Sequence, residues 1–177
     1  MRASVRKAIK DAYMHTQQYK DLEYRIVKEA VITTIKKEIE KKCDSNVNVN
    51  ADTNYSTSYA LDITHKSDPT PDALIQKGWS RLKIKFPYYR FTIRISWLGP
   101  FAMTFWNRYN KPGEPQFLWR ADQKMGRFLE ECAHEILKEH SITVLDTDEL
   151  KEEINEVKVP LLDGTPSVLR LLFAQYM

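Results

Sequence analysis

The residues best suited to metal chemistry are the pair His134-Glu135, which opens the zinc-binding motif of many metalloproteases. That motif needs a second histidine four residues after the first, so that both face one metal ion. Lys138 occupies this position, and His140 comes six residues after His134. We therefore expect no metal site: His134 is predicted to be a solvated helix residue, and His140 to interact with the helix dipole.

The two cysteines, Cys43 and Cys132, lie far apart and show no C-x-x-C spacing. Cys132 precedes His134 by two residues, which on a helix separates them by roughly 200° and rules out a nucleophile–base pair. We expect Cys132 to be a core residue and both cysteines to be free thiols, as in a reducing, cytoplasmic compartment. The segment 1–10 is charged and lacks the apolar stretch of a signal peptide.

Acidic residues are concentrated between Asp146 and Glu153, but they lack the calcium-loop pattern. The chain also has only five glycines, no glycine-rich phosphate loop, no Ser-His-Asp set and no G-x-S-x-G motif. The sequence therefore predicts no catalytic residue, no metal and no cofactor.

The charged residues are separated along the chain, although the net charge is only +3. Residues 73–113 contain eight basic residues and no acidic one, whereas residues 130–156 contain ten acidic residues and two basic ones. Such a separation favours a binding role over a catalytic one.

The basic residues belong to two segments that alternate between apolar and polar side chains, which is the pattern of half-buried strands. We expect strands 81–86 and 89–97 to form a hairpin around Pro87-Tyr88, with the pairs Phe86–Tyr89, Ile84–Phe91 and Leu82–Ile93. A third strand, 101–108, is predicted to place Phe101, Met103 and Phe105 on the same apolar side.

The polar side of this sheet is then the candidate partner-binding surface. Like charges opposed across strands are destabilising, so this surface calls for negative charge. Its sources are the chain's own acidic segment 146–156, an acidic protein partner, or a nucleic-acid backbone. The predicted binding residues are Arg81, Lys83, Lys85, Arg90, Arg94, Trp106 and Arg108.

The elements around these strands predict an α+β fold of one domain, residues 1–177. Residues 1–42 are expected to be helical, with a break near 16–20, and residues 44–54 to form a polar loop. An antiparallel sheet of about four strands in meander order follows over residues 55–108. Helices over residues 119–177 are expected to pack on one sheet face, the longest at 119–140 and a short acidic one at 146–156.

This layout is shared by small binding proteins such as toxin-neutralising immunity proteins and secretion chaperones, an analogy at the level of fold. We expect a non-enzymatic protein-binding module of the inhibitor, immunity or adaptor kind, with an acidic protein partner. The alternatives are a nucleic-acid-binding protein that uses the same basic face, and an enzyme with a site assembled from scattered residues.

No apolar run approaches the roughly 20 residues of a membrane helix. Changing Arg90 and Arg94 to glutamate is expected to weaken binding without disturbing the fold.

Overall fold

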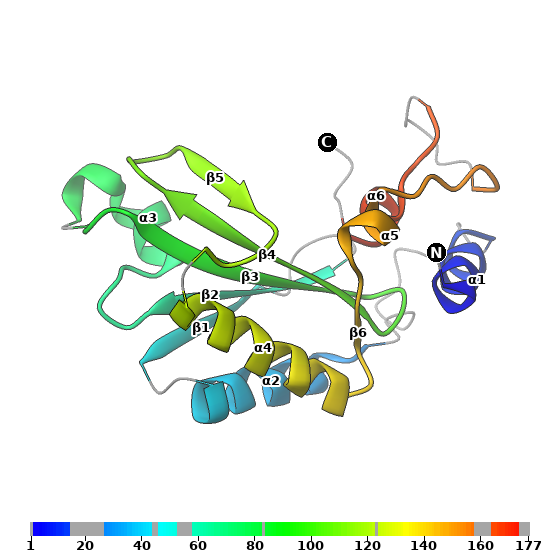
Figure 1. Ribbon diagram of the computed structural model, residues 1–177, viewed down its shortest axis with the longest axis horizontal. Coiled ribbons are helices and arrows are strands. Elements are labelled where there is room, and N and C mark those ends of the chain that lie inside the picture. Colours follow the sequence, from blue (N-terminus) through cyan, green and yellow to red (C-terminus); the bar gives the residue numbers. More distant parts are fainter. Residues whose placement is uncertain are drawn as a thin grey trace.

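The computed structural model describes residues 2–14, 27–43, 46–52, 58–82, 84–122, 124–157 and 164–173. At its centre is an antiparallel sheet in meander order, which confirms the predicted α+β class (Figure 1). Among the described residues the sheet has six strands rather than about four. They are β1 (Val47–Asp52), β2 (Ser58–His65), β3 (Tyr88–Ser96), β4 (Phe101–Tyr109), β5 (Pro115–Leu118) and β6 (Thr143–Val144), which pairs parallel to β4.

The helices largely follow the expected order. The predicted break at 16–20 lies outside the described residues, and the helix expected from residue 119 begins at Lys124. Asp146 caps the short acidic helix by accepting from the backbone N–H groups of Asp148 and Glu149. The helices are α1 (Ala3–Met14), α2 (Glu29–Glu38) with the π-helical turn η2 (Ile39–Cys43), α3 (Pro71–Lys77) with the 3-10 turn η3 (Trp79–Arg81), α4 (Lys124–Glu139), α5 (Thr147–Lys151) and α6 (Val168–Phe173).

Strand β1 replaces the polar loop expected over residues 44–54. Its asparagines, Asn48 and Asn50, alternate with the buried Val47 and Val49, which join the same core as α2. The prediction was wrong because it gave the loop-forming tendency of the asparagines more weight than the alternation of polar and apolar residues. The alternation is what a half-buried strand needs at the border of a sheet.

The predicted hairpin of 81–86 with 89–97 is not formed. Strand β3 pairs with β2 on one side and with β4 on the other, so it has no free edge for a further strand. Ile84 and Phe86 instead pack beside Tyr88 and Tyr109 in a small separate cluster. Their apolar alternation therefore reflects packing against the end of the sheet, not pairing within it.

The register of β3 with β4 also differs from the expected one. Phe91 pairs with Trp106 and Ile95 with Ala102, so odd-numbered residues of β3 lie opposite even-numbered residues of β4. Opposite residues share a face of the sheet. The side chains predicted to share the face of Phe91, namely Phe101, Met103 and Phe105, therefore lie on the other face.

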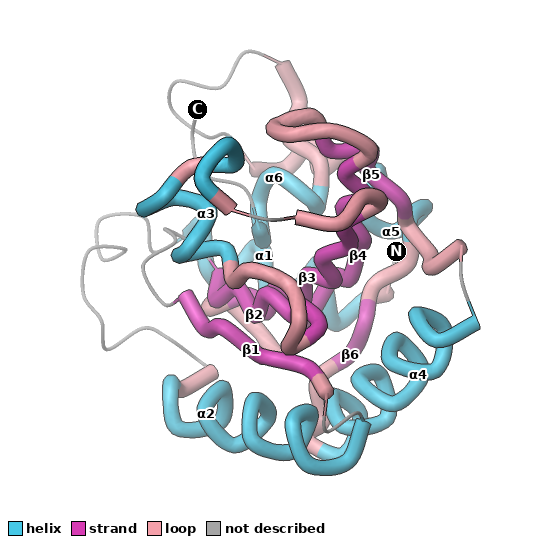
Figure 2. Tube along the Cα trace, turned by 90° about the vertical axis from the view of Figure 1, so that its left-hand side faces the viewer, coloured by secondary structure: helices cyan, strands magenta, loops and turns pink. Residues whose placement is uncertain are grey.

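Helices cover both faces of the sheet rather than one. The face with Phe91 and Ile93 packs against α2 and α4 and is called here the α2/α4 face. The face with Phe101 and Met103 packs at one end against α1, α5 and α6 and is called the α6 face. Figure 2 shows α2 and α4 side by side along one side of the strands. Within the described part of the chain, no helix has the length and apolar character needed to cross a membrane.

Cys43 and Cys132 form a disulfide, so the prediction of two free thiols is wrong. The bond joins η2 to α4 across a Cα–Cα distance of 5.5 Å, although 89 residues separate the cysteines in the chain. The two helices run side by side, which brings these distant positions together. Cys132 is half-buried against the core, in agreement with its expected place on the apolar stripe.

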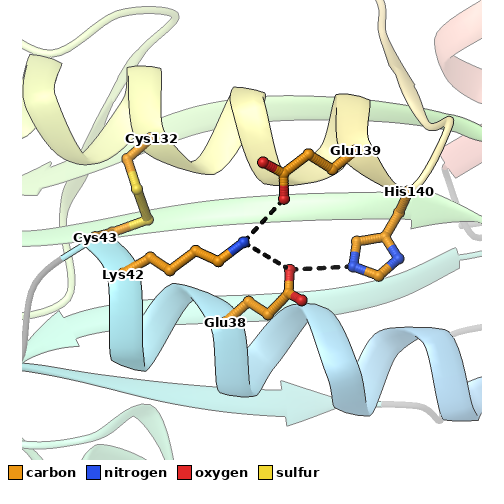
Figure 3. A network of polar contacts seen from close by, with 6 residues as sticks. All are labelled: Glu38, Lys42, Cys43, Cys132, Glu139 and His140. Carbon is orange, nitrogen blue, oxygen red and sulfur yellow. Dashed lines mark hydrogen bonds and ion pairs between the residues drawn. A yellow bond between two sulfur atoms is a disulfide. The ribbon is translucent and has the colours of Figure 1, made fainter.

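A polar network joins the same two helices next to the disulfide (Figure 3). The ammonium group of Lys42 lies 2.9 Å from a carboxylate oxygen of Glu139 and 3.7 Å from one of Glu38. The imidazole Nε2 of His140 lies 3.2 Å from the same Glu38 oxygen. His140 thus has a carboxylate neighbour on α2 in addition to its position at the end of α4.

Replacing both cysteines, Cys43→Ser with Cys132→Ser, should lower the free energy of unfolding by about 4.5 kcal/mol, because the bond closes a long loop in the unfolded chain. Urea denaturation measures the change. The wild-type protein treated with dithiothreitol should match the double variant. A wild-type protein whose midpoint does not respond to dithiothreitol would contradict the disulfide.

Candidate functional site

The arginines of β3 lie together on the α6 face, where the protein itself engages them. The guanidinium of Arg90 is 3.7 Å from the Asp62 carboxylate of β2 and lies over the ring of Tyr109. The guanidinium of Arg94 donates to the main-chain carbonyl of Phe173 at 2.9 Å. Both side chains are half-buried, so these contacts within the protein limit their availability to a partner.

The two β4 residues predicted to share that face lie on the opposite one. Trp106 is only 6% exposed, stacks on Phe91 and donates its indole N–H to Glu130 at 3.2 Å. Arg108 pairs with Asp122 at 3.2 Å beneath α4's first residues and lies over the ring of Tyr89. The odd–even register of β3 with β4 causes this separation.

The remaining predicted residues belong to the segment that does not become a strand. Arg81 is exposed in η3 and Lys85 is exposed in the loop after it, whereas Lys83 lies outside the described residues. The seven predicted residues therefore do not form one continuous basic face. A binding role for individual members stays a prediction.

One of the three expected sources of negative charge for the sheet was the chain's own acidic segment 146–156. This segment does not neutralise the sheet. Its carboxylates pair instead with cations in α1 and with Arg2, which directly precedes that helix. Arg2 lies 3.0 Å from Glu149, and Arg6 lies 2.8 Å from Glu156. Lys10 adds a third contact to Glu156 at 3.2 Å. The opposite charges of the two chain ends thus join α1 to the region of α5.

The substitution Arg94→Glu should destabilise the fold, contrary to the expectation from the sequence. It replaces the donor to the Phe173 carbonyl with a second acceptor, and losing a charged hydrogen bond of this kind costs about 2 kcal/mol. Thermal and urea unfolding measure the loss. The matched control Arg81→Glu changes an exposed charge and should alter stability by less than about 0.5 kcal/mol. Equal stability of the two variants would contradict this role of Arg94.

An open sheet edge lies in the middle of β4. Strand β5 pairs with residues 106–109 and β6 with residues 101–102, so neither covers residues 103–105. The carbonyl of Ala102 accepts from the backbone N–H of Leu145 on this side. Because alternate residues of a strand bond to the same side, the backbone N–H and C=O of Thr104 point to the open edge.

A cleft of about 730 Å³ opens at this edge, and we call it the edge cleft. One wall is α4, another is the chain that leaves β5, and a third is the chain that leaves β6. The side chains that define it include Thr104, Trp119, Arg120, Arg127, Glu130, His134 and Asp146.

His134 lies in the edge cleft and is not the solvated residue that the sequence predicted. Its Nε2 is 2.9 Å from the Thr104 hydroxyl, and the side chain is half-buried. Burial lowers the pKa of His134 below the ordinary histidine value of 6.5, and the nearby Glu130 carboxylate opposes this shift in part. His134 is therefore neutral at pH 7.

Glu130 is held by two donors, the indole N–H of Trp106 at 3.2 Å and the backbone N–H of Ala121 at 3.1 Å. This contact needs α4 to lie close to the chain that precedes it. Gly126 permits the approach, since a Cβ atom there would come within 2.8 Å of the Ala121 side chain. The glycine thus sets the position of the α4 wall.

Uncompensated cations gather at the β5 end of the edge cleft. Arg120 and Arg127 are exposed, and neither forms an ion pair with another described residue. Arg127 donates only to the main-chain carbonyl of Ala121, at 3.4 Å. Asp146 lies at the other end, beyond β6, so the lining changes sign along its length.

Three aromatic rings form a platform beside the edge cleft. Phe105 stacks on Phe117 with centroids 4.9 Å apart, and Trp119 meets Phe117 edge-on at 4.7 Å. Phe117 is 46% exposed on β5, one of the two outer strands in the order β1 to β5. We call Phe105, Phe117 and Trp119 the aromatic platform. This platform was not predicted from the sequence, because Trp119 was expected to begin a helix and Phe117 was assigned to no element; their spacing of two residues was the available signal.

His134 should make the stability of the protein depend on pH. Its pKa is lower in the folded state than in the unfolded state, so the unfolded state binds more protons between the two values. The free energy of unfolding should therefore fall as the pH drops below about 6.5 and level off below the folded pKa. Urea unfolding at pH 7.5 and pH 5 should show a smaller loss for His134→Gln than for the wild type. An identical loss would assign the effect to other groups.

Within the described residues, no three histidine, cysteine or acidic side chains are grouped in a way that could hold a metal ion. The site is thus a mixed-charge cleft at an open strand edge, flanked by exposed aromatic rings. Comparisons with protein-family models, curated proteins and solved structures found nothing that matches this chain.

Proposed function

We propose that the protein is a non-enzymatic protein-binding module that holds an extended segment of a partner at the open edge of β4. The observation that carries this proposal is the stretch 103–105 of β4, which neither β5 nor β6 pairs and whose Thr104 lines the edge cleft, together with the nearby exposed Phe117. An inhibitor, immunity or adaptor role is compatible with such a module. The surface differs from the basic face expected from the sequence.

The geometry suits recognition by strand addition. A partner segment can exchange main-chain hydrogen bonds with the backbone of Thr104, as extended peptides do at exposed sheet edges. The segment would be short, because β5 and β6 limit the open edge at both ends. Affinity must then come from side chains, and exposed aromatic residues such as Phe117 and Trp119 are frequent anchors in interfaces.

The charges indicate the kind of segment. Arg120 and Arg127 are available to bind carboxylates at the β5 end of the edge cleft, which supports an acidic partner. Asp146, which lies beyond β6, favours a neutral or basic residue at the other end. The partner segment is thus acidic at one end only.

A single-stranded nucleic acid is the second candidate, because aromatic rings next to arginines also stack bases and contact phosphates. Glu130, Glu131 and Asp146 line the same cleft and repel a uniformly charged backbone. This repulsion favours a protein segment over a nucleic acid.

The disulfide bears on where such binding takes place. Disulfides persist mainly in oxidising compartments, and the cytoplasmic location was expected on the assumption of free thiols. The bond between Cys43 and Cys132 removes that support. We infer that binding occurs with the disulfide intact.

A random peptide display library provides the test. Enriched peptides should carry acidic residues near one end, and fluorescence polarisation should measure their Kd. The variant Phe117→Ala should weaken binding at least fivefold, and Arg120→Glu with Arg127→Glu at least tenfold. A labelled oligo(U) strand, measured in parallel, should bind more weakly than the peptides at physiological salt.

The matched control is Phe128→Ala, because Phe128 is an equally exposed aromatic residue, 53% exposed, on α4 outside the lining of the edge cleft. It should leave the Kd unchanged. Thermal unfolding verifies that each variant is folded. An unenriched library, equal effects of Phe117→Ala and Phe128→Ala, or tighter binding of oligo(U) would each overturn the proposal.

A further inference from the structure

A second, smaller pocket lies on the α2/α4 face, where the beginning of α4 approaches the paired ends of β1 and β2. Its volume is about 340 Å³, within the range of pockets that take small molecules. The proposed partner binding does not use it. Its apolar walls are formed by Val47, Ile63, Tyr89, Trp106, Ala121 and Leu129.

Two aromatic side chains in this lining are fixed in place. The Trp106 ring is held by its stacking on Phe91 and by the hydrogen bond of its N–H to Glu130. The hydroxyl of Tyr89 donates to Asp122 at 3.3 Å. The Arg108 guanidinium already lies over the ring of Tyr89, so the two rings serve here as rigid apolar walls.

Two carboxylates contribute to the lining, and their surroundings differ. Asp122 accepts from Tyr89 and is paired with Arg108 at 3.2 Å, so its charge is largely compensated. Asp68 is half-buried and forms no ion pair with another described residue. Burial raises the pKa of Asp68, as is usual for a carboxylate that lacks a cation.

Two neighbours oppose this rise in the pKa of Asp68 in part, His65 through its charge and Ser67 through a side-chain hydrogen bond. The imidazole Nδ1 of His65 lies 2.7 Å from the Ser67 hydroxyl and accepts from the Ser67 backbone N–H at 3.2 Å, so neither residue forms a full ion pair with Asp68. Asp68 thus remains a partly desolvated negative charge at an apolar, aromatic pocket. A small cation with an apolar body would neutralise the carboxylate of Asp68 and fill the apolar part of the pocket.

We propose that this pocket binds a small organic ammonium ion, with its apolar body against Tyr89, Trp106 and Leu129 and its charged group directed to Asp68. The mostly apolar lining disfavours a bare metal ion, which needs several converging oxygen ligands. The uncompensated carboxylate disfavours an anion. A body of about one aromatic ring fits the volume.

Nuclear magnetic resonance titration with three related probes tests the charge preference on the wild-type protein. The probes are benzylammonium, benzyl alcohol and benzoate, which share one ring and differ in charge. Benzylammonium should shift the indole N–H signal of Trp106 and the backbone signals of Ile63 and Leu129. Its Kd should be at least fivefold lower than that of the alcohol, and benzoate should not bind.

The variant Asp68→Asn preserves the shape of the side chain and removes its charge. It should raise the Kd for benzylammonium at least fivefold and leave that for benzyl alcohol unchanged. The matched control is Glu135→Gln, which removes an exposed charge of α4 outside both cavities. This control should leave both values unchanged.

Three results would overturn the proposal. The first is equal affinity for benzylammonium and benzyl alcohol, and the second is a set of shifted signals away from the pocket. The third is tighter binding of N-acetyl-lysine amide than of benzylammonium, which would assign the pocket to a lysine side chain of a protein. The comparison of probes on the wild type does not depend on whether Asp68→Asn folds.

Discussion

The pairing of β3 with both of its neighbours is the constraint on which the rest of the structure depends. Ile93 at its centre lies opposite Leu61 of β2 and Thr104 of β4, and all three point to the α2/α4 face. A shift of one residue would move every side chain of a strand to the other face. This register buries Trp106 and directs Thr104 to His134. It also places Arg90 and Arg94 on the α6 face. The lining of both cavities and the contacts of these arginines therefore depend on it.

Much of the fold could be predicted from periodicity, because β3, β4 and α4 carry strong apolar patterns within one segment each. The partners of the strands could not be predicted in the same way. The expected hairpin used the nearest alternating segment, whereas β3 finds β2 from residues well before it. The face of β4 depends on how many residues the turn between Ser96 and Phe101 holds. Alternation within each strand does not reveal that number.

The prediction of the candidate site met the same limit, because sequence patterns do not reveal contacts between distant segments. The predicted arginines were identified by their charge and by the alternation of the strands, and neither says whether a side chain is already paired inside the fold. Arg90 has Asp62, Arg94 has the Phe173 carbonyl and Arg108 has Asp122. The exposed arginines of the edge cleft, Arg120 and Arg127, lie just after β5 and in α4, where no strand pattern marked them. The prediction that His134 is solvated considered only its own helix. It did not include the hydroxyl of Thr104, which lies on β4.

The disulfide divides the chain into a covalently closed loop, residues 43–132, and two tails outside it. The loop contains β1 to β5, whereas α1, α5 and α6 belong to the tails and are joined to one another by contacts such as Arg6–Glu156. Regions held by fewer constraints open at lower free energy than the whole domain. The edge cleft has Arg127 and Glu130 on the closed loop and Asp146 on a tail. Asp146 follows β6 directly, and the backbone N–H of Leu145 donates to Ala102 of β4. The wall of the edge cleft that belongs to a tail is therefore tied to the closed loop by the pairing of β6 with β4 and not by the disulfide, so the width of the cleft depends on that pairing.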